Sequence, residues 1–247
     1  MKVTIITPTF NSAATVRDTL QSVAAQSYGA IEHIIVDGRS QDETLEFISA
    51  FPHVSKVISE QDLGIFDAMN KGITQAQGDI IGILNSDDIY SSSEVIQQVV
   101  QIFQTTSSDA LYANLVYTRR EDTSKVVRRW VSGNYARTNF YRGWMPPHPT
   151  FFVKRSIYEQ FGKYNLDFKN AADYELMLRF LFKENIKVTY LPIELVRMRV
   201  GGASNRSLRS RISSNRMDAL AWKVNGLKPK WYTFIRKPLS KLKQYFQ

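Results

Sequence analysis

The fold is decided by residues 79–90, which read Asp-Ile-Ile-Gly-Ile-Leu-Asn-Ser-Asp-Asp-Ile-Tyr. Four large aliphatic residues interrupted only by a glycine are typical of a strand that is buried on both faces. The strand ends at Asn85, and two adjacent carboxylates, Asp87 and Asp88, follow. Because ligands of open α/β sheets bind at the carboxyl ends of the strands, these acids favour a divalent cation that carries phosphate oxygens. A solvated turn is the alternative, since Asn, Ser and Asp are common turn residues.

The composition favours a cytoplasmic protein that is soluble or peripheral to a membrane. The chain has no cysteine, which excludes disulfides and thiolate sites and suits a reducing compartment. No apolar run is long enough for a signal peptide or a membrane span. The formal charge of +9 is uneven, because residues 197–247 hold thirteen Lys or Arg and one acid, a charge of +12, which leaves the first 196 residues with −3.

Strand-and-helix units follow one another in the first part of the chain. Aliphatic and β-branched runs predict strands at 3–7, 31–36, 54–59 and 79–84, and the stretches after them predict helices at 13–26, 41–51, 65–75 and 94–104. Such a succession predicts a parallel, Rossmann-like sheet. The glycines match neither the dinucleotide pattern nor the P-loop pattern. Instead, acids follow three strands, at Asp37, at Asp62, and at Asp87 with Asp88, which solvation alone explains poorly.

The second half of the chain predicts further strands and one more acidic position. These strands, the first two antiparallel to each other, are expected at 110–117, 125–130, 150–153 and 188–191. Prolines stiffen the loop 143–149, which carries His148. Asp173 stands at the start of the apolar helix predicted at 174–182. The plain explanation for an acid at this position is its favourable interaction with the helix N-terminus.

Taken in order, five motifs resemble the inverting glycosyltransferases of family 2, which have the GT-A fold, and in particular bacterial enzymes that build O-antigen, capsule or colanic-acid repeat units. The resemblance runs from Val3 to about Ser204. The motifs are Thr-Pro-Thr-Phe-Asn at 7–11, Ile-Val-Asp-Gly-x-Ser-x-Asp-x-Thr at 35–44, Glu-x-Asp-x-Gly-Ile-Phe-Asp-Ala-Met-Asn-Lys-Gly at 60–72, Gly-Asp to Asp-Asp at 78–88, and Asp-Tyr-Glu-Leu at 173–176.

The resemblance implies an α/β GT-A fold with a mostly parallel, Rossmann-like central sheet flanked by helices and a small antiparallel part on the acceptor side. Residues 1–204 would form the catalytic domain, with a nucleotide-sugar-binding half at 1–107 and an acceptor half at 108–204. Residues 205–247 would form a basic, aromatic, helical extension.

The resemblance also implies roles for individual residues. The donor would be bound by Thr7, Pro8, Thr9, Asp37, Asp62, Asn70, Lys71, Asn85, Ser86 and Asp87, with Asp37 accepting from the base edge. Asp67 would brace its helix. Asp87 and Asp88 would hold Mn²⁺ or Mg²⁺ at the place of the Asp-x-Asp-Asp motif, whose first acid is Asn85 here. Asp173 matches the catalytic base, although the acid that often precedes it in relatives is Ala172 here.

Two further features allow both a structural and a functional interpretation. His148 either bonds the backbone between its prolines or contacts diphosphate, metal or acceptor. The segment 201–204, Gly-Gly-Ala-Ser, is either an ordinary linker or a loop that closes over the donor, with Arg197 and Arg199 near enough in sequence to steady phosphates.

These roles imply inverting, metal-dependent, non-processive transfer of one sugar from a nucleotide sugar, expected to be a UDP-sugar, to a polyprenyl-diphosphate-linked saccharide. Polymerising relatives carry Gln-x-x-Arg-Trp after the base, whereas the only Arg-Trp here, at 129–130, precedes Asp173. A sugar-nucleotide nucleotidyltransferase is one alternative, but it would need a Gly-rich basic loop after the first strand.

The basic tail alternates Lys and Arg with Trp222, Trp231, Tyr232, Phe234, Tyr245 and Phe246. This composition suits anionic lipid headgroups, with aromatic rings at headgroup level, and a solvated helix is the plain alternative. A non-catalytic, basic nucleic-acid-binding protein would need basic residues over an aromatic β surface. Because the basic residues lie in the tail and the expected site is acidic, we expect a membrane surface and no nucleic acid as partner.

Overall fold

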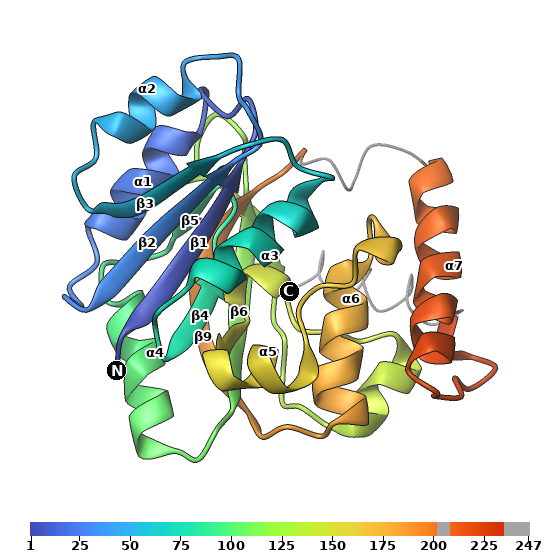
Figure 1. Cartoon of the computed structure of the whole chain (residues 1–247). Helices are drawn as coiled ribbons and strands as arrows, with labels where there is room; N and C mark the ends of the chain where they lie inside the picture. The colour runs from blue at the N-terminus through green and yellow to red at the C-terminus, as the bar shows by residue number, and fades with distance from the viewer. Residues whose placement is uncertain (202–207, 235–247) are drawn as a thin grey trace.

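One mixed sheet runs through the part of the chain that the structure, a computed structural model, describes, which is residues 1–201 and 208–234 (Figure 1). Its nine strands have the order β3-β2-β1-β4-β8-β6-β9-β5, with β7 paired to β6. β1, β2, β3 and β4 are parallel, and β6 is parallel to β9. β5, β7 and β8 run antiparallel to their neighbours. The predicted mostly parallel α/β sheet is therefore confirmed.

The first seven elements alternate between strand and helix as predicted. They are β1 (Val3–Thr9), α1 (Val16–Ala24), β2 (Ile31–Asp37), α2 (Thr44–Ser49), β3 (Val54–Ser59), α3 (Ile65–Gln75) and β4 (Ile80–Ile83). α1 and α2 begin about one turn later than expected. The reason is that Asp42 and Thr44 accept hydrogen bonds from backbone N–H groups of the two preceding loops, which competes with helix formation.

The remaining elements depart further from the expected pattern. They are β5 (Asp88–Tyr90), α4 (Val95–Thr105), β6 (Ala110–Thr118), β7 (Val126–Trp130), the 3₁₀ turns η1 (Arg137–Arg142), η2 (His148–Thr150) and η3 (Leu166–Phe168), β8 (Phe152–Lys154), α5 (Arg155–Phe161), α6 (Ala172–Met177), the π-helix η4 (Leu178–Lys183), β9 (Val188–Arg199) and α7 (Leu208–Val224). β5 was not expected, and β9 extends eight residues beyond the predicted strand. Both differences have one cause, because β5 pairs with the unexpected part of β9.

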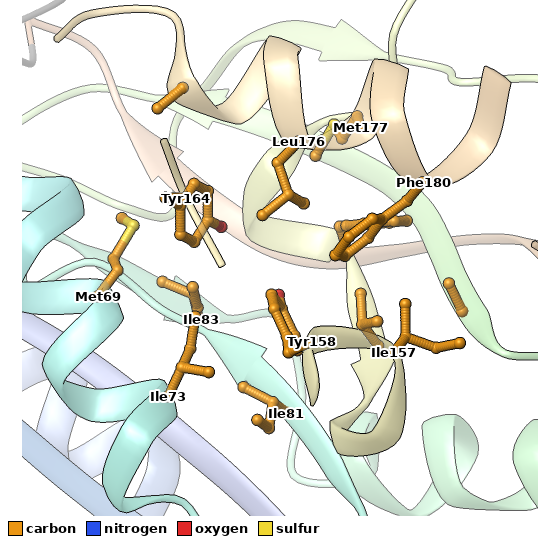
Figure 2. Close-up of a cluster of buried hydrophobic side chains, with 14 of the residues drawn as sticks. Met69, Ile73, Ile81, Ile83, Ile157, Tyr158, Tyr164, Leu176, Met177 and Phe180 are labelled. Atoms are coloured by element: carbon orange, nitrogen blue, oxygen red, sulfur yellow. The ribbon is translucent and has the colours of Figure 1, made fainter. Parts of the chain in front are cut away.

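Helices cover both faces of the sheet. α1, α2 and α4 pack on one face, while α3, α5 and α6 pack on the other. Figure 2 shows how α3, α5 and α6 meet over β4. Met69 and Ile73 of α3 lie on one side of Ile81 and Ile83, and side chains of α5 and α6 lie on the other side. Residues 1–107 and 108–204 therefore share one hydrophobic core, and β4 lies at its centre.

Part of the predicted tail belongs to this core. α7 lies alongside α6 at the edge of the molecule (Figure 1), and the side chain of Trp222 is fully buried between Tyr141 and Phe182. The expectation that Trp222 faces a membrane is therefore wrong, because the ring is enclosed by protein. Tyr245 and Phe246 lie outside the described residues. None of the helices in the described ranges is long and apolar enough to cross a bilayer.

The close approach of β4 to β8 gives the first prediction. A Cβ atom on Gly82 would stand 2.3 Å from Cε1 of Phe152, whose ring is buried. We expect Gly82→Ala to lower the free energy of unfolding by about 1–3 kcal/mol, because the ring has no free space to move into. Gly29→Ala, with nothing within 4 Å of the new atom, is the matched control and should change it by less than about 0.5 kcal/mol. Urea unfolding measures both, and equal stabilities would contradict this packing.

Candidate functional site

The loops after β1 and β2 are bonded to each other at the carboxyl edge of the sheet. The N–H of Asn11 donates to Ser40 Oγ at 2.9 Å, and the N–H of Ser12 donates to Thr44 Oγ1 at 2.7 Å. Asn11 and Arg39 adopt positive φ angles of 47° and 62°. Residues other than glycine rarely adopt positive φ angles, and residues that do so are often found at functional sites. The two loops thus form one rim over the strand ends.

Asp37 is the buried centre of this rim. Its carboxylate accepts from Thr9 Oγ1 at 3.2 Å, from Ser59 Oγ at 2.7 Å, and from both the N–H and the hydroxyl of Ser40 at 3.1 and 2.5 Å. A carboxylate has about four acceptor positions, so the protein uses all of them. Asp37 therefore ties the ends of three strands together, and the predicted bond to a base edge would have to displace one of these donors.

The three residues predicted to line the base are buried in this arrangement. Thr7 is fully buried and its Oγ1 lies 2.9 Å from His33 Nε2, while Pro8 and Thr9 are also enclosed. Phe10, the next residue, is 64% exposed and lies against Gly38, where a Cβ would stand 3.3 Å from its ring. Sequence reasoning gave Phe10 no role, although an aromatic residue at the end of a buried strand was a usable signal.

Lys71 is engaged by the loop that precedes α3. Its ammonium lies 2.6 Å from Asp62, 3.0 Å from Glu60 and 3.4 Å from Asp67, and it donates to the Gln61 carbonyl at 2.8 Å. Burial disfavours the charge, but the hydrogen bonds to Asp62 and Glu60 outweigh it and raise the pKa of Lys71. Lys71 and Asp62 therefore hold this loop in place. Asp67 braces the helix as expected, since it also accepts from the N–H of Leu63.

Asn70 joins the two halves of the molecule. Its amide donates to the Tyr164 carbonyl at 2.8 Å and accepts from the Tyr164 N–H at 2.9 Å. All of this pairing is with the loop that leads to Asp173. Asn70 therefore links α3 to this loop, and its contact with the donor stays a prediction.

The turn after β4 presents the acids that the sequence analysis singled out. Ser86 Oγ lies 2.8 Å from Ser12 Oγ, which joins this turn to the rim. Asp87 is partly exposed, whereas Asp88 is fully buried and accepts from the Asn85 amide at 3.1 Å. Burial, together with the charge of Asp87, raises the pKa of the Asp88 carboxyl well above its ordinary value. Asp87 is thus the acid that a ligand can reach directly.

His148 lies between this turn and Asp173. The Asn85 amide approaches His148 Nε2 at 3.4 Å, and His148 Nδ1 is 3.7 Å from Asp173 Oδ2. Burial lowers the pKa of His148, while the charges of Asp173 and Asp87 oppose that shift. The ring is therefore neutral at pH 7. With Nε2 facing an amide donor, its proton belongs on Nδ1, toward Asp173.

Asp173 and Asp87 are brought to one place by separate elements. Asp173 lies in the first turn of α6, its side chain is 23% exposed, and its Oδ1 accepts from the N–H of Tyr174 at 2.8 Å. η2, which carries His148, packs on β4, β6 and β9. A partly exposed carboxylate near a second acid suits proton removal beside a bound polyphosphate.

The two arginines expected near phosphates have other partners. Arg199 is 4% exposed and donates to the carbonyls of Asp87 at 2.8 Å and Arg120 at 3.0 Å, and it also pairs with Asp18. Arg197 donates to the Thr123 carbonyl at 3.1 Å. The expectation that Arg199 steadies phosphates is therefore wrong for this arrangement, because protein groups occupy its donors. Of the segment 201–204, residues 202–204 lie outside the described residues.

Known proteins resemble this chain in sequence. The sequence model of glycosyl transferase family 2 matches residues 4–187. An uncharacterized glycosyltransferase of Mycobacterium tuberculosis is 33% identical over 186 residues, which cover 72% of this chain and 68% of that protein. A PGL/p-HBAD biosynthesis glycosyltransferase of Mycobacterium bovis is 29% identical over 208 residues, covering 81% of this chain and 78% of that one.

Solved structures share the fold. S. aureus TarS 1–349 superposes with a TM-score of 0.74 at 18% identity, covering 97% of this chain and 72% of that chain. The mannosyltransferase PcManGT from Pyrobaculum calidifontis gives a TM-score of 0.67 at 19% identity, covering 99% of this chain and 69% of that chain. Because the family match spans most of the chain, the chain belongs to glycosyl transferase family 2 and is a nucleotide-sugar-dependent glycosyltransferase with the GT-A fold.

Proposed function

We propose that the chain transfers one sugar with inversion and without processivity, using Asp173 as the base. The observation that carries this proposal is that Asp173 and Asp87 both lie close enough to His148 for their charges to act on the ring, with 3.7 Å between His148 Nδ1 and Asp173. The proposed base lies at Nδ1 of the His148 ring, and Asn85, in the turn that carries Asp87, lies at Nε2.

The proposed reaction is a single displacement. The oxygen of the acceptor hydroxyl forms a bond to the anomeric carbon, and the bond from that carbon to the nucleoside diphosphate breaks with its electron pair leaving on the diphosphate. Asp173 takes the hydroxyl proton. The Tyr174 N–H donates to one oxygen of Asp173, and the neutral His148 ring faces the other. These two neighbours fix the orientation of the carboxylate before the acceptor binds.

We infer that Asp87 and Asp88 hold Mn²⁺ or Mg²⁺ when the donor is bound. Asn85 Oδ1 and Asp88 Oδ1 are buried without a hydrogen-bond partner, so the turn offers two acceptor oxygens that lack a donor or a cation. Within the described residues no group of three or more His, Asp or Glu forms a complete cage. This agrees with the preference of Mg²⁺ for one or two carboxylates plus phosphate oxygens. When bound, the ion would neutralise the leaving diphosphate.

The donor is proposed to be a UDP-sugar that lies along the rim. TarS has been solved in complex with UDP-GlcNAc and PcManGT with GDP-Man and Mn²⁺. Phe10, at the end of β1, offers an exposed ring on which a base can stack, and such stacking contributes about 1–3 kcal/mol in other proteins. The sugar and diphosphate would then extend toward Ser86 and Asp87.

The acceptor is proposed to be a polyprenyl-diphosphate-linked saccharide of bacterial surface polysaccharide synthesis, met at the inner face of the cytoplasmic membrane. The support is a surface with basic and apolar residues at the end of α7 and in the segment after it, which we call the 223–231 surface. Its exposed residues are Lys223, Val224, Lys228, Lys230 and Trp231, of which Trp231 is 84% exposed. Lysines near anionic lipid contribute about 1 kcal/mol each, and tryptophan prefers the headgroup level.

The proposed base gives the second prediction. Asp173→Asn keeps the shape of the side chain but cannot take a proton, so transfer should fall by about 10²–10⁴-fold while UDP binding, measured by calorimetry, persists. A panel of nucleotide sugars with Mn²⁺ and a synthetic lipid-diphosphate saccharide, read by mass, measures transfer. Asp167→Asn, which changes an exposed acid on the preceding loop, is the control. Undiminished transfer by Asp173→Asn would remove this residue from the mechanism.

The buried Asp88 gives the third prediction. Because its pKa is raised in the folded state, the folded protein favours the protonated form, and this contribution is complete below the ordinary pKa of Asp and is lost as the pH rises toward the raised value. Without metal, Asp88→Asn should therefore gain stability over wild type as the pH rises from 4 to 8, measured by urea unfolding in EDTA.

Bound metal should instead stabilise the wild type more than Asp88→Asn. Mn²⁺ with UDP should raise the melting temperature of the wild type more than that of Asp88→Asn, because the variant lacks the ligand charge. Two results would count against the proposed site: a stability difference that is independent of pH, or an equal response of both proteins to Mn²⁺ with UDP.

The 223–231 surface gives the fourth prediction. Removing residues 205–247 would strip Trp222 from the core, so substitutions are the better test. Lys228→Glu with Trp231→Ala should weaken flotation with phosphatidylglycerol vesicles about ten-fold or more. Lys125→Glu with Val127→Ala reverses one lysine charge and shortens one exposed apolar side chain in the β6–β7 region, and should leave flotation unchanged. Equal flotation of both variants, or none by the wild type, would exclude this surface.

A further inference from the structure

The two residues that follow Asp173 are both anchored to the end of α7, where Asn225 directly follows the last helical residue. Tyr174 and Glu175 are each 2% exposed. Trp222 Nε1 donates to the Tyr174 hydroxyl at 2.9 Å, and Asn225 Nδ2 donates to Glu175 Oε1 at 3.0 Å. α7 lies beyond residue 187, where the family match ends, so these contacts come from a part of the chain that the family motifs do not include.

Glu175 is the meeting point of three elements. Arg179 holds its carboxylate with two hydrogen bonds, from Nε at 3.0 Å and from Nη2 at 3.0 Å. The same guanidinium donates to the carbonyls of Lys163 at 2.7 Å, Gly162 at 3.1 Å and Phe161. A buried charge pair is stable only when its remaining donors and acceptors are satisfied. Asn225 therefore completes a clamp that joins the end of α5, α6 and α7.

α6 depends on such side-chain anchors because it is short. It has six residues before it widens into the π-helix η4, and helices of this length are not stable by themselves. Leu176 points into the hydrophobic cluster that also contains Tyr158 of α5 (Figure 2). Successive residues on a helix are about 100° apart, so fixing residues 174 and 175 also fixes the direction of Asp173.

We propose that α7 is a positioning element for the reaction, in which Trp222 and Asn225 set the rotation of α6 that directs Asp173 toward His148 and the acceptor. This inference rests on the proposed function, because it takes Asp173 to be the base. Neither residue of α7 touches substrate in this proposal. A displacement of about 1 Å at a reacting group can cost on the order of 10²-fold in rate, so small rotations of α6 are sufficient to matter.

The test separates positioning from stability. Asn225→Ala removes one donor to Glu175, and Trp222→Phe keeps a ring between Tyr141 and Phe182 but removes the N–H. We expect each to lower kcat of transfer about 10-fold and the pair to lower it about 100-fold. The donor KM should stay within about two-fold of wild type, because the donor half is untouched.

Two controls define the comparison. Ile48→Ala truncates a side chain that is 2% exposed in α2, in a separate core cluster, and should lower the melting temperature as much or more while kcat stays within about two-fold. Arg216→Ala changes an exposed residue of α7 outside the 223–231 surface and should change neither quantity.

The outcomes are distinct. If the α7 variants lose melting temperature but keep kcat, as Ile48→Ala does, α7 only stabilises the fold and the inference is overturned. If instead their donor KM rises with kcat unchanged, α7 acts on the donor half and the inference is equally overturned. If Asp173→Asn itself transfers normally, the assignment of the base has failed, and that result is visible without any α7 variant.

Discussion

The site depends on one buried guanidinium. Arg199, at the end of β9, holds the carbonyl of Asp87 in the turn after β4, the carbonyl of Arg120 after β6, and the carboxylate of Asp18 in α1. These three partners are far apart in sequence, so this one side chain fixes the turn that carries the acids in relation to both halves of the sheet. Lysine could not do the same, because it lacks the planar fork that reaches several acceptors at once.

The acids at the strand ends fall into two groups that differ in how well their oxygens are bonded. Asp37 accepts four hydrogen bonds and Asp62 is paired with Lys71, so both stabilise the loops they join. Asp88 and Asn85 instead keep one unpaired oxygen each. Buried polar atoms without partners are costly and therefore rare away from functional sites. The contrast favours the turn after β4 as the place where a ligand completes the structure.

The sequence predicted the first half of the fold well because its signals are local. β3 and α3 have the bounds that the sequence pattern indicated. β5 was missed because three residues form a strand only when β9, more than a hundred residues later, pairs with them. The bonds of Asn70 with Tyr164 and of Lys71 with Asp62 were not foreseen for a similar reason. A motif gives the residue type at a strand end, but the neighbour that a side chain bonds is decided by tertiary packing.

The C-terminal segment shows why composition alone was misleading there. Trp222 and Trp231 stand in the same basic, aromatic stretch, yet Trp222 is fully buried against Tyr141 and Phe182 and Trp231 is 84% exposed. Trp222 lies on the side of α7 that faces Tyr174, whereas Trp231 comes after the end of α7. In the proposed function, residues 222–231 therefore have two neighbours: a lipid surface, and α6, the helix that carries the proposed base. The acceptor half, rather than the donor half, would then lie next to the membrane, which is where a lipid-linked saccharide must enter.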